Sequence, residues 1–164
     1  MPTQRYQVEQ ISSGEGGIQI SIIKETIEIK CPVDKVFIYV TDVKTWPKWH
    51  LSIQEANQTS SGQMGIGTTL RGVNKTMGRR MPWTSKVTEY VANERVSHTA
   101  SSGRTLIKYQ GTFDPIEDGT RFTITSEMKV GGFLKLLSPI VTKKMRKEVK
   151  TNLGSLKSIL EAKA

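Results

Sequence analysis

The side chains of this sequence that could do chemistry are few, and the two most promising lie on neighbouring predicted strands. His98 falls in residues 95–101 and Tyr109 in residues 104–113, and period-two alternation places each on the apolar face of its strand. An imidazole beside a phenol or a carboxylate can act as a general base, and Glu148 is the other candidate partner. A lone inward histidine is also common as a hydrogen-bonded core residue, so both roles stay open.

Metal-ligand and nucleophile motifs are missing from the sequence. His50 and His98 are the only histidines, Cys31 is the only cysteine, and no short-spaced pair links them. There is no GxSxG motif, and the glycine-rich residues 62–68 lack the Lys-Ser/Thr of a phosphate loop and precede a strand rather than a helix. We therefore expect no metal and no cofactor, and the sequence leaves the catalytic residues unknown.

A long amphipathic helix, predicted over residues 138–162, must help to position these groups. Ser138 and Pro139 are typical of a helix start. Asn152 lies only about 20° from the centre of the apolar stripe, so it needs a partner, either the backbone of a strand or loop or a polar group on a ligand. The stripe repeats at steps of three and four: Leu137, Val141, Met145, Val149, Leu153, Leu156 and Leu160. The residues assigned to the opposite side are Lys143, Arg146, Lys147, Lys150 and Lys157.

The rest of the chain reads mainly as strands. Residues 18–30 alternate as a strand whose change of parity predicts a bulge or bend near residues 23–26. Residues 32–43 and 45–49 have the apolar spacing of two short helices. Six strands follow, one around Ile53 and the others over residues 68–75, 81–91, 95–101, 104–113 and 120–130. This order predicts an α+β fold, with a curved antiparallel β-sheet of about seven strands gripping a long C-terminal α-helix.

Several different short motifs follow one another along residues 18–162. They are Ile27-Glu28-Ile29 before Cys31-Pro32-Val33-Asp34-Lys35-Val36-Phe37, Thr41-Asp42, Trp46-Pro47-Lys48-Trp49, Gly65-Ile66-Gly67-Thr68, Gly119-Thr120-Arg121-Phe122, the run from Leu134 to Pro139, and Asn152-Leu153 with Leu156-Lys157. As a set they resemble the SRPBCC superfamily, also called START-like or helix-grip, in its polyketide cyclase/dehydrase-type branch. The resemblance implies an apolar cavity between sheet and long helix that holds a hydrophobic small molecule, with catalysis in some members. It supplies no catalytic motif that can be placed on this chain.

Strand and helix periodicity select the side chains that would line such a cavity. The predicted ligand-binding residues are Leu70, Trp83, His98, Tyr109, Phe122, Met128, Met145, Val149 and Asn152. The leading hypothesis is binding of a hydrophobic or aromatic small molecule, such as a lipid, polyketide or isoprenoid-like compound. The alternative is a polyketide cyclase/dehydrase-like enzyme that uses His98 and Tyr109 as acid and base.

Composition sets the remaining expectations. The chain has 164 residues and a net charge of +9, which we assign mainly to the solvated side of the last helix. A third hypothesis is that the positive charge binds RNA, the ribosome or an acidic protein. Separately, Arg79 and Arg80 could bind an anionic headgroup at the mouth of the cavity. We expect a cytoplasmic protein without a membrane span. The sequence has one cysteine, it has no apolar run of about 20 residues, and its first residues lack a secretory pattern. We expect a flexible arm over residues 1–17 and one domain over residues 18–164, and the oligomeric state stays open.

Overall fold

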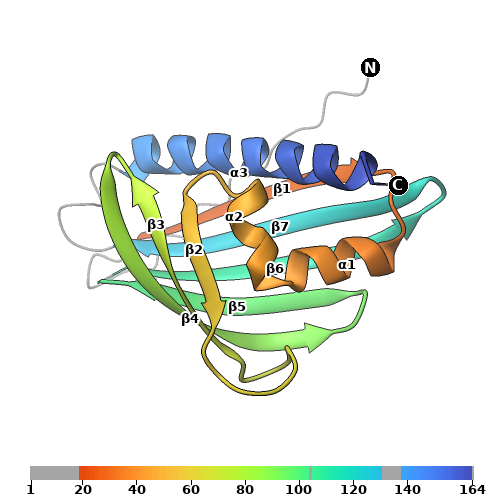
Figure 1. Ribbon diagram of the computed structural model, residues 1–164. Coiled ribbons are helices and arrows are strands. Elements are labelled where there is room, and N and C mark those ends of the chain that lie inside the picture. The colour runs from red at the N-terminus through yellow and green to blue at the C-terminus, as the bar shows by residue number, and fades with distance from the viewer. Residues whose placement is uncertain (1–18, 104, 131–137, 164) are drawn as a thin grey trace.

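The chain folds as a long helix held by a curved sheet (Figure 1). The computed structural model describes residues 19–103, 105–130 and 138–163. The elements in order are β1 (Gln19–Ile29), α1 (Val33–Thr41), the 3-10 turn η1 (Val43–Thr45), α2 (Trp46–Trp49), β2 (Ile53–Gln58), β3 (Thr69–Thr76), β4 (Arg79–Val91), β5 (Arg95–Ser102), β6 (Thr105–Ile116), β7 (Gly119–Val130) and α3 (Ser138–Glu161). This order confirms the predicted α+β architecture. The predicted arm over residues 1–17, and Leu137 of the helix stripe, lie outside the described residues.

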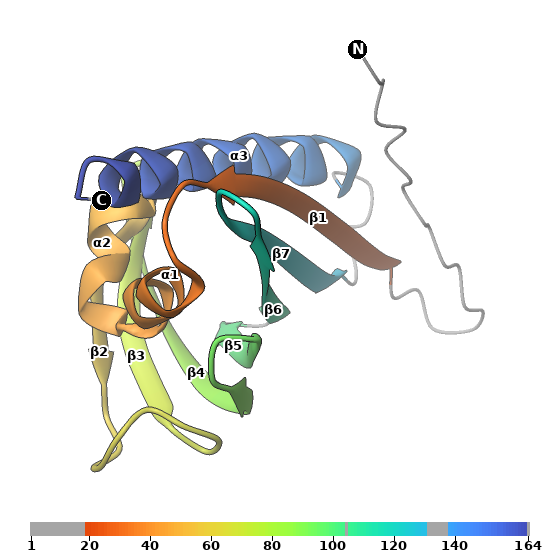
Figure 2. The ribbon, with the colours of Figure 1, turned by 90° about the vertical axis from the view of Figure 1, so that its right-hand side faces the viewer.

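A single seven-stranded sheet has the order β1-β7-β6-β5-β4-β3-β2, and every neighbouring pair is antiparallel. The first strand therefore pairs with the last, and the three helices lie on the concave side of the curled sheet (Figures 1 and 2). Helix α3 contacts β1 and α2, while α1 contacts β6 and β7. None of the helices in the described ranges is long and apolar enough to cross a lipid bilayer.

The densest packing lies where α1 and the C-terminal half of α3 meet β6 and β7. The ring of Phe37 on α1 meets the edge of Phe113 with 5.0 Å between centroids, and Phe113 stacks on Phe122 at 4.8 Å. Leu156 on α3 is completely buried in the same cluster, and Leu160 nearly so. This end of the interior is filled by the chain's own side chains, as a close-packed core requires.

The predicted bulge in β1 is wrong. The register between β1 and β7 is unbroken along the whole of β1. The apparent change of parity arises because Ile20 and Ile22 have the outward parity of β1, while Glu25 occupies an inward position between Ile23 and Ile27 and is paired with Arg146 and Lys150 on α3. A bulge does occur in the β4–β5 hairpin, where the pairing of β4 with β5 shifts between Val87 and Glu89.

The hairpin between β3 and β4 is tighter than predicted. Thr76 pairs directly with Arg79, so β4 begins two residues before the expected position and the predicted loop over residues 77–80 shrinks to two residues. Met77 and Gly78 form this turn with φ of +51° and +77°. Two positive φ values are the geometry of the type I′ turns that close two-residue hairpins.

Candidate functional site

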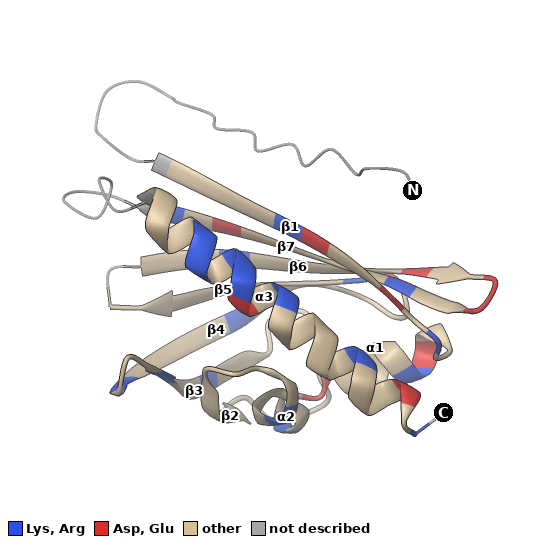
Figure 3. Ribbon diagram, turned by 90° about the horizontal axis from the view of Figure 1, so that it is seen from above, with Lys and Arg blue, Asp and Glu red and all other residues tan. Residues whose placement is uncertain are grey.

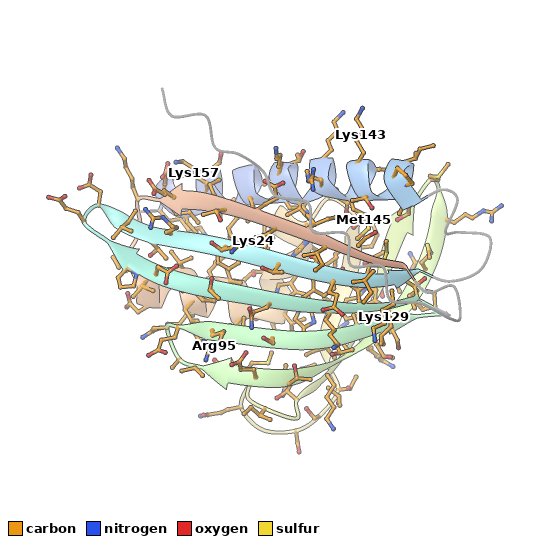
Figure 4. The ribbon with its side chains drawn as sticks, turned by 180° about the vertical axis from the view of Figure 1, so that it is seen from behind. Lys24, Arg95, Lys129, Lys143, Met145 and Lys157 are labelled. Carbon is orange, nitrogen blue, oxygen red and sulfur yellow. The ribbon has the colours of Figure 1, made fainter. Side chains whose placement is uncertain are left out.

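The predicted lining residues lie on β3 to β7 and on α3, and the structure divides them into two groups. Leu70, Trp83, Phe122, Met128 and Asn152 are buried. The other four are half-buried, and they come from elements that face each other: His98 and Tyr109 from the sheet, Met145 and Val149 from α3. Figure 4 shows Met145 on the sheet side of α3, with Lys143 projecting from the opposite side. The half-buried members of the predicted set therefore come from β5, β6 and the N-terminal half of α3.

Four aromatic rings form a continuous series, here called the ring row, from β4 through α2 to β6. Trp83 stacks near Trp46 with 6.1 Å between centroids, Trp46 lies 5.5 Å from His98, and His98 stacks on Tyr109 at 5.0 Å. Both indole N–H groups are satisfied, because Trp46 donates to the carbonyl oxygen of Val40 and Trp83 to Asn74 Oδ1, each at 2.8 Å. The ring row therefore offers apolar faces with few unmet hydrogen bonds.

His98 is held in one orientation by Ser85 on the adjacent strand. Ser85 Oγ lies 2.8 Å from His98 Nδ1 and 3.1 Å from the carbonyl oxygen of Thr99. A carbonyl only accepts, so the serine hydroxyl donates to Thr99, and His98 Nδ1 must carry the proton that Ser85 accepts. This leaves Nε2 with a free lone pair. Burial lowers the pKa of His98 from 6.5 to about 4, so the imidazole is neutral at pH 7.

The second histidine is fixed by Asn152. The Oδ1 atom of Asn152 accepts a hydrogen bond from the backbone N–H of Leu51 at 2.9 Å, and its Nδ2 donates to His50 Nδ1 at 3.2 Å. Asn152 thus bonds a loop backbone, one of the two roles considered for it. Burial, and secondarily the nearness of His98, lowers the pKa of His50 to about 3. The described residues contain no group of three or more His, Cys, Asp or Glu that could hold a metal ion.

Most of the chain matches the sequence pattern of one known protein family. The sequence pattern of the family described as "Polyketide cyclase / dehydrase and lipid transport" matches residues 22–161. The chain belongs to this family. The resemblance drawn from the ordered motifs is thereby confirmed, and the fold is one associated with hydrophobic ligands or cyclase-like chemistry. No curated protein matches the chain in sequence.

Solved structures with low sequence identity share the fold. A protein from Thermus thermophilus superimposes with a TM-score of 0.75 at 20% identity, covering 87% of this chain and 99% of that one. The Zhui aromatase/cyclase from a Streptomyces species gives 0.74 at 11% identity, covering 87% and 94%. A START superfamily protein from Mycobacterium smegmatis gives 0.69 at 14% identity, covering 87% and 99%. At these identities the likeness concerns the fold alone.

In this polyketide cyclase/dehydrase and lipid transport family member, the phenol of Tyr109 keeps its proton at neutral pH and can donate a hydrogen bond. Burial, and to a smaller extent the charge of Glu148, raises the pKa of Tyr109 to about 12. Tyr109 and His98 thus present a hydroxyl donor and an imidazole with a free acceptor side by side. Such a pair can orient a polar group on an otherwise apolar molecule.

The contacts between α3 and β1 show that part of the predicted solvent-facing basic side of the helix is wrong. Glu25 is only 7% exposed, and its carboxylate lies 3.4 Å from Arg146 Nε and 3.9 Å from Lys150 Nζ. Lys157 Nζ donates to the carbonyl oxygen of Glu28 at 2.8 Å. Three of the five residues assigned to the side facing away from the sheet therefore line β1. Arg146 and Lys150 lie there because the buried carboxylate of Glu25 requires nearby positive charge.

The predicted ligand-binding set leaves out three residues of the site: Ser85, Trp46 and His50. Ser85 shares its parity with Trp83, and that alternation was enough to place its hydroxyl on the inner face. Trp46 is buried in the core, but its contact with His98 joins two segments that are distant in sequence. The same is true of His50, which no local pattern connects to Asn152.

Proposed function

We propose that this protein binds a hydrophobic small molecule, of the lipid, polyketide or isoprenoid-like class, between the ring row and the N-terminal half of α3. One observation carries the proposal: inward-facing side chains from both walls keep accessible surface there. These side chains are His98 and Tyr109 on the sheet and Met145 and Val149 on the helix. The family match supports it, because the family description includes lipid transport.

The two halves of α3 give an internal comparison. Leu153, Leu156 and Leu160 continue the stripe of Met145 and Val149, yet they are buried while the earlier two are not. Protein interiors are normally close-packed along such a stripe, so the difference needs an explanation. A ligand that covers the exposed apolar area would gain about 25 cal/mol per Å² of buried surface, before the cost of ordering.

The enzymatic alternative is weaker on the same geometry. A general base works best when its pKa lies near the working pH. His98, with its pKa lowered to about 4, is too weak a base at pH 7, and Tyr109, with its pKa raised to about 12, is a weak acid. These groups are better suited to donating and accepting hydrogen bonds than to moving protons, which favours binding.

A ligand panel tests the proposal. We expect the melting temperature to rise with at least one lipid, polyketide or isoprenoid-like compound, and native mass spectrometry to detect a one-to-one complex. A uniformly flat response across the panel would argue against it. If a panel compound is turned over, and His98→Ala abolishes turnover but not binding, the protein is an enzyme instead.

Filling the proposed site gives a more local test. Ala100 is half-buried on β5, two residues from His98 and paired with Ser85, whereas Ala56 on β2 is buried in the core. We expect Ala100→Phe to be tolerated and to block ligand binding, because the ring occupies the same space. The matched variant Ala56→Phe should cost about 1–3 kcal/mol of unfolding free energy through overpacking. Equal destabilisation by both variants, measured by urea unfolding, would mean that no room exists beside His98.

A further inference from the structure

We propose that the end of the molecule formed by the β3–β4 hairpin and the start of α3 docks on a membrane surface rich in anionic phospholipid. We call this end the docking end, and define it by Met77, Arg79, Met81, Ile140, Lys143 and Lys144. The inference does not require the proposed ligand, so docking and ligand binding can fail independently.

The turn residue Met77 is the first observation. It has a φ of +51°, in the left-handed region where a side chain with a Cβ is strained and where Asn or Gly is normally found. Among the described residues, the other non-glycine with positive φ is Asn93, at the β4–β5 turn, which follows that rule. Met77 is also 86% exposed. A large apolar side chain in a strained and solvated position stabilises nothing in the folded chain, which points to a role outside it.

Other exposed apolar side chains lie at the same end. Figures 1 and 3 place the β3–β4 turn, the β5–β6 turn and the start of α3 at one end of the molecule. Ile140, in the first turn of α3, is 70% exposed. Met81 on β4 is also exposed, at 44%. Surface apolar residues are ordinary when scattered, but Met77, Met81 and Ile140 come from the two projecting elements of one end, where they can enter a lipid interface.

Charge at this end complements an anionic surface. Its exposed basic residues are Arg79, Lys143 and Lys144, and the exposed Lys75 and Lys129 lie near it on β3 and β7. Figure 4 places Lys129 and Lys143 toward this end. Arg80 is neutralised by Glu55, whose carboxylate lies 2.7 Å away. The far end has mixed charge instead: Glu117 and Asp118 lie in the β6–β7 turn, and Glu161 at the end of α3 lies beside Lys30 and Lys157 (Figure 3). The resulting field orients the docking end toward negative charge.

The exposed apolar side chains of the docking end favour a membrane over RNA as the partner. RNA-binding surfaces combine basic residues with aromatic rings that stack on bases. The exposed large apolar residues here are aliphatic or methionine, and aromatic residues are absent from that set among the described residues. Methionine and isoleucine flanked by lysine and arginine instead suit the boundary between headgroups and acyl chains.

Vesicle sedimentation tests the proposal on the full chain. We expect binding to phosphatidylcholine vesicles that contain phosphatidylserine, and little binding to phosphatidylcholine alone. Binding should fall steeply near 1 M salt, where the Debye length is only about 3 Å. The triple variant Arg79→Glu, Lys143→Glu, Lys144→Glu should weaken partitioning by about a hundredfold or more, since each basic residue near an anionic surface contributes about a fivefold factor.

Met77→Asn separates docking from folding. Asn adopts positive φ readily, so we expect an unchanged or higher melting temperature, together with a loss of about tenfold in vesicle partitioning at constant charge. The matched charge control for the triple variant is Lys35→Glu, Lys44→Glu, Lys48→Glu, which makes the same change in net charge at exposed positions away from the docking end and should bind as the unaltered chain does. Equal binding to neutral vesicles, no binding to either kind, or full binding by Met77→Asn would overturn the proposal. So would salt-sensitive RNA binding without vesicle binding.

Discussion

Lowering the pH from 6.5 to about 4 is expected to reduce the unfolding free energy by about 3 kcal/mol or more through His50 and His98 alone. Both imidazoles have folded-state pKa values, about 3 and about 4, below their ordinary value of 6.5. Above pH 6.5 both the folded and unfolded states are neutral at these positions, so the histidines do not affect stability. As the pH falls below 6.5, the unfolded chain takes up protons that the folded chain does not, and stability is lost.

The size of the effect follows from the width of this pH window. Each histidine contributes a slope of up to about 1.4 kcal/mol per pH unit between its unfolded and folded pKa values. The full slope for two groups would give about 7 kcal/mol over two and a half units, and we reduce this figure because both side chains keep some contact with solvent. The carboxylates of Glu89 and Glu161, whose pKa values are lowered by hydrogen bonds, lose their contribution at lower pH, below 4.5.

Urea unfolding at a series of pH values measures this loss directly. The sequence has only two histidines, so the double variant His50→Gln, His98→Gln removes every imidazole. We expect its unfolding free energy to be flat between pH 6.5 and about 4.5, apart from carboxylate effects, and each single variant to keep about half of the slope. An unaltered slope in the double variant would show that the histidines are not buried in their neutral form.

How far the sequence predicts the fold depends on which side chains face inward. Alternation identified the inner faces of β5, β6 and β7 correctly, because His98 lies against Trp46 and Tyr109, and Phe122 stacks on Phe113 in the core. It failed in β1 because Glu25 faces inward, and the pairing with Arg146 that stabilises this arrangement involves a helix more than a hundred residues away. A local pattern cannot reveal a buried charge whose partner is distant in sequence.

The candidate site shows the same limit. His98 and Tyr109 could be placed next to each other, because adjacent strands in a hairpin bring the same inner face together. The position of Trp46 depends instead on how α2 lies over the sheet, which no spacing within residues 45–49 specifies. The tautomer of His98 depends on Ser85 and so on the register between β4 and β5, and the β4 bulge makes that register hard to predict.

The second large effect is expected at a glycine that supports the ring row. Gly72 on β3 pairs with Trp83, and a Cβ added there would overlap both the Trp83 indole and the backbone carbonyl oxygen of Glu55. Its φ is not in the left-handed region, so glycine is needed for contact and not for backbone conformation. Gly72→Ala should therefore displace Trp83 from Trp46 and cost about 3 kcal/mol of unfolding free energy.

Gly154 provides the matched control, because the same change there has the opposite expected sign. A Cβ added at Gly154 on α3 meets no atom within 4 Å, and Ala is favoured over Gly inside a helix by about 1 kcal/mol. Gly154→Ala should raise the melting temperature, while Gly72→Ala lowers it, alters the near-ultraviolet circular dichroism of the tryptophans and weakens any ligand response. If the two variants were equally stable and their tryptophan spectra matched, Trp83 could not be lying against β3, and the ring row would lose its first member.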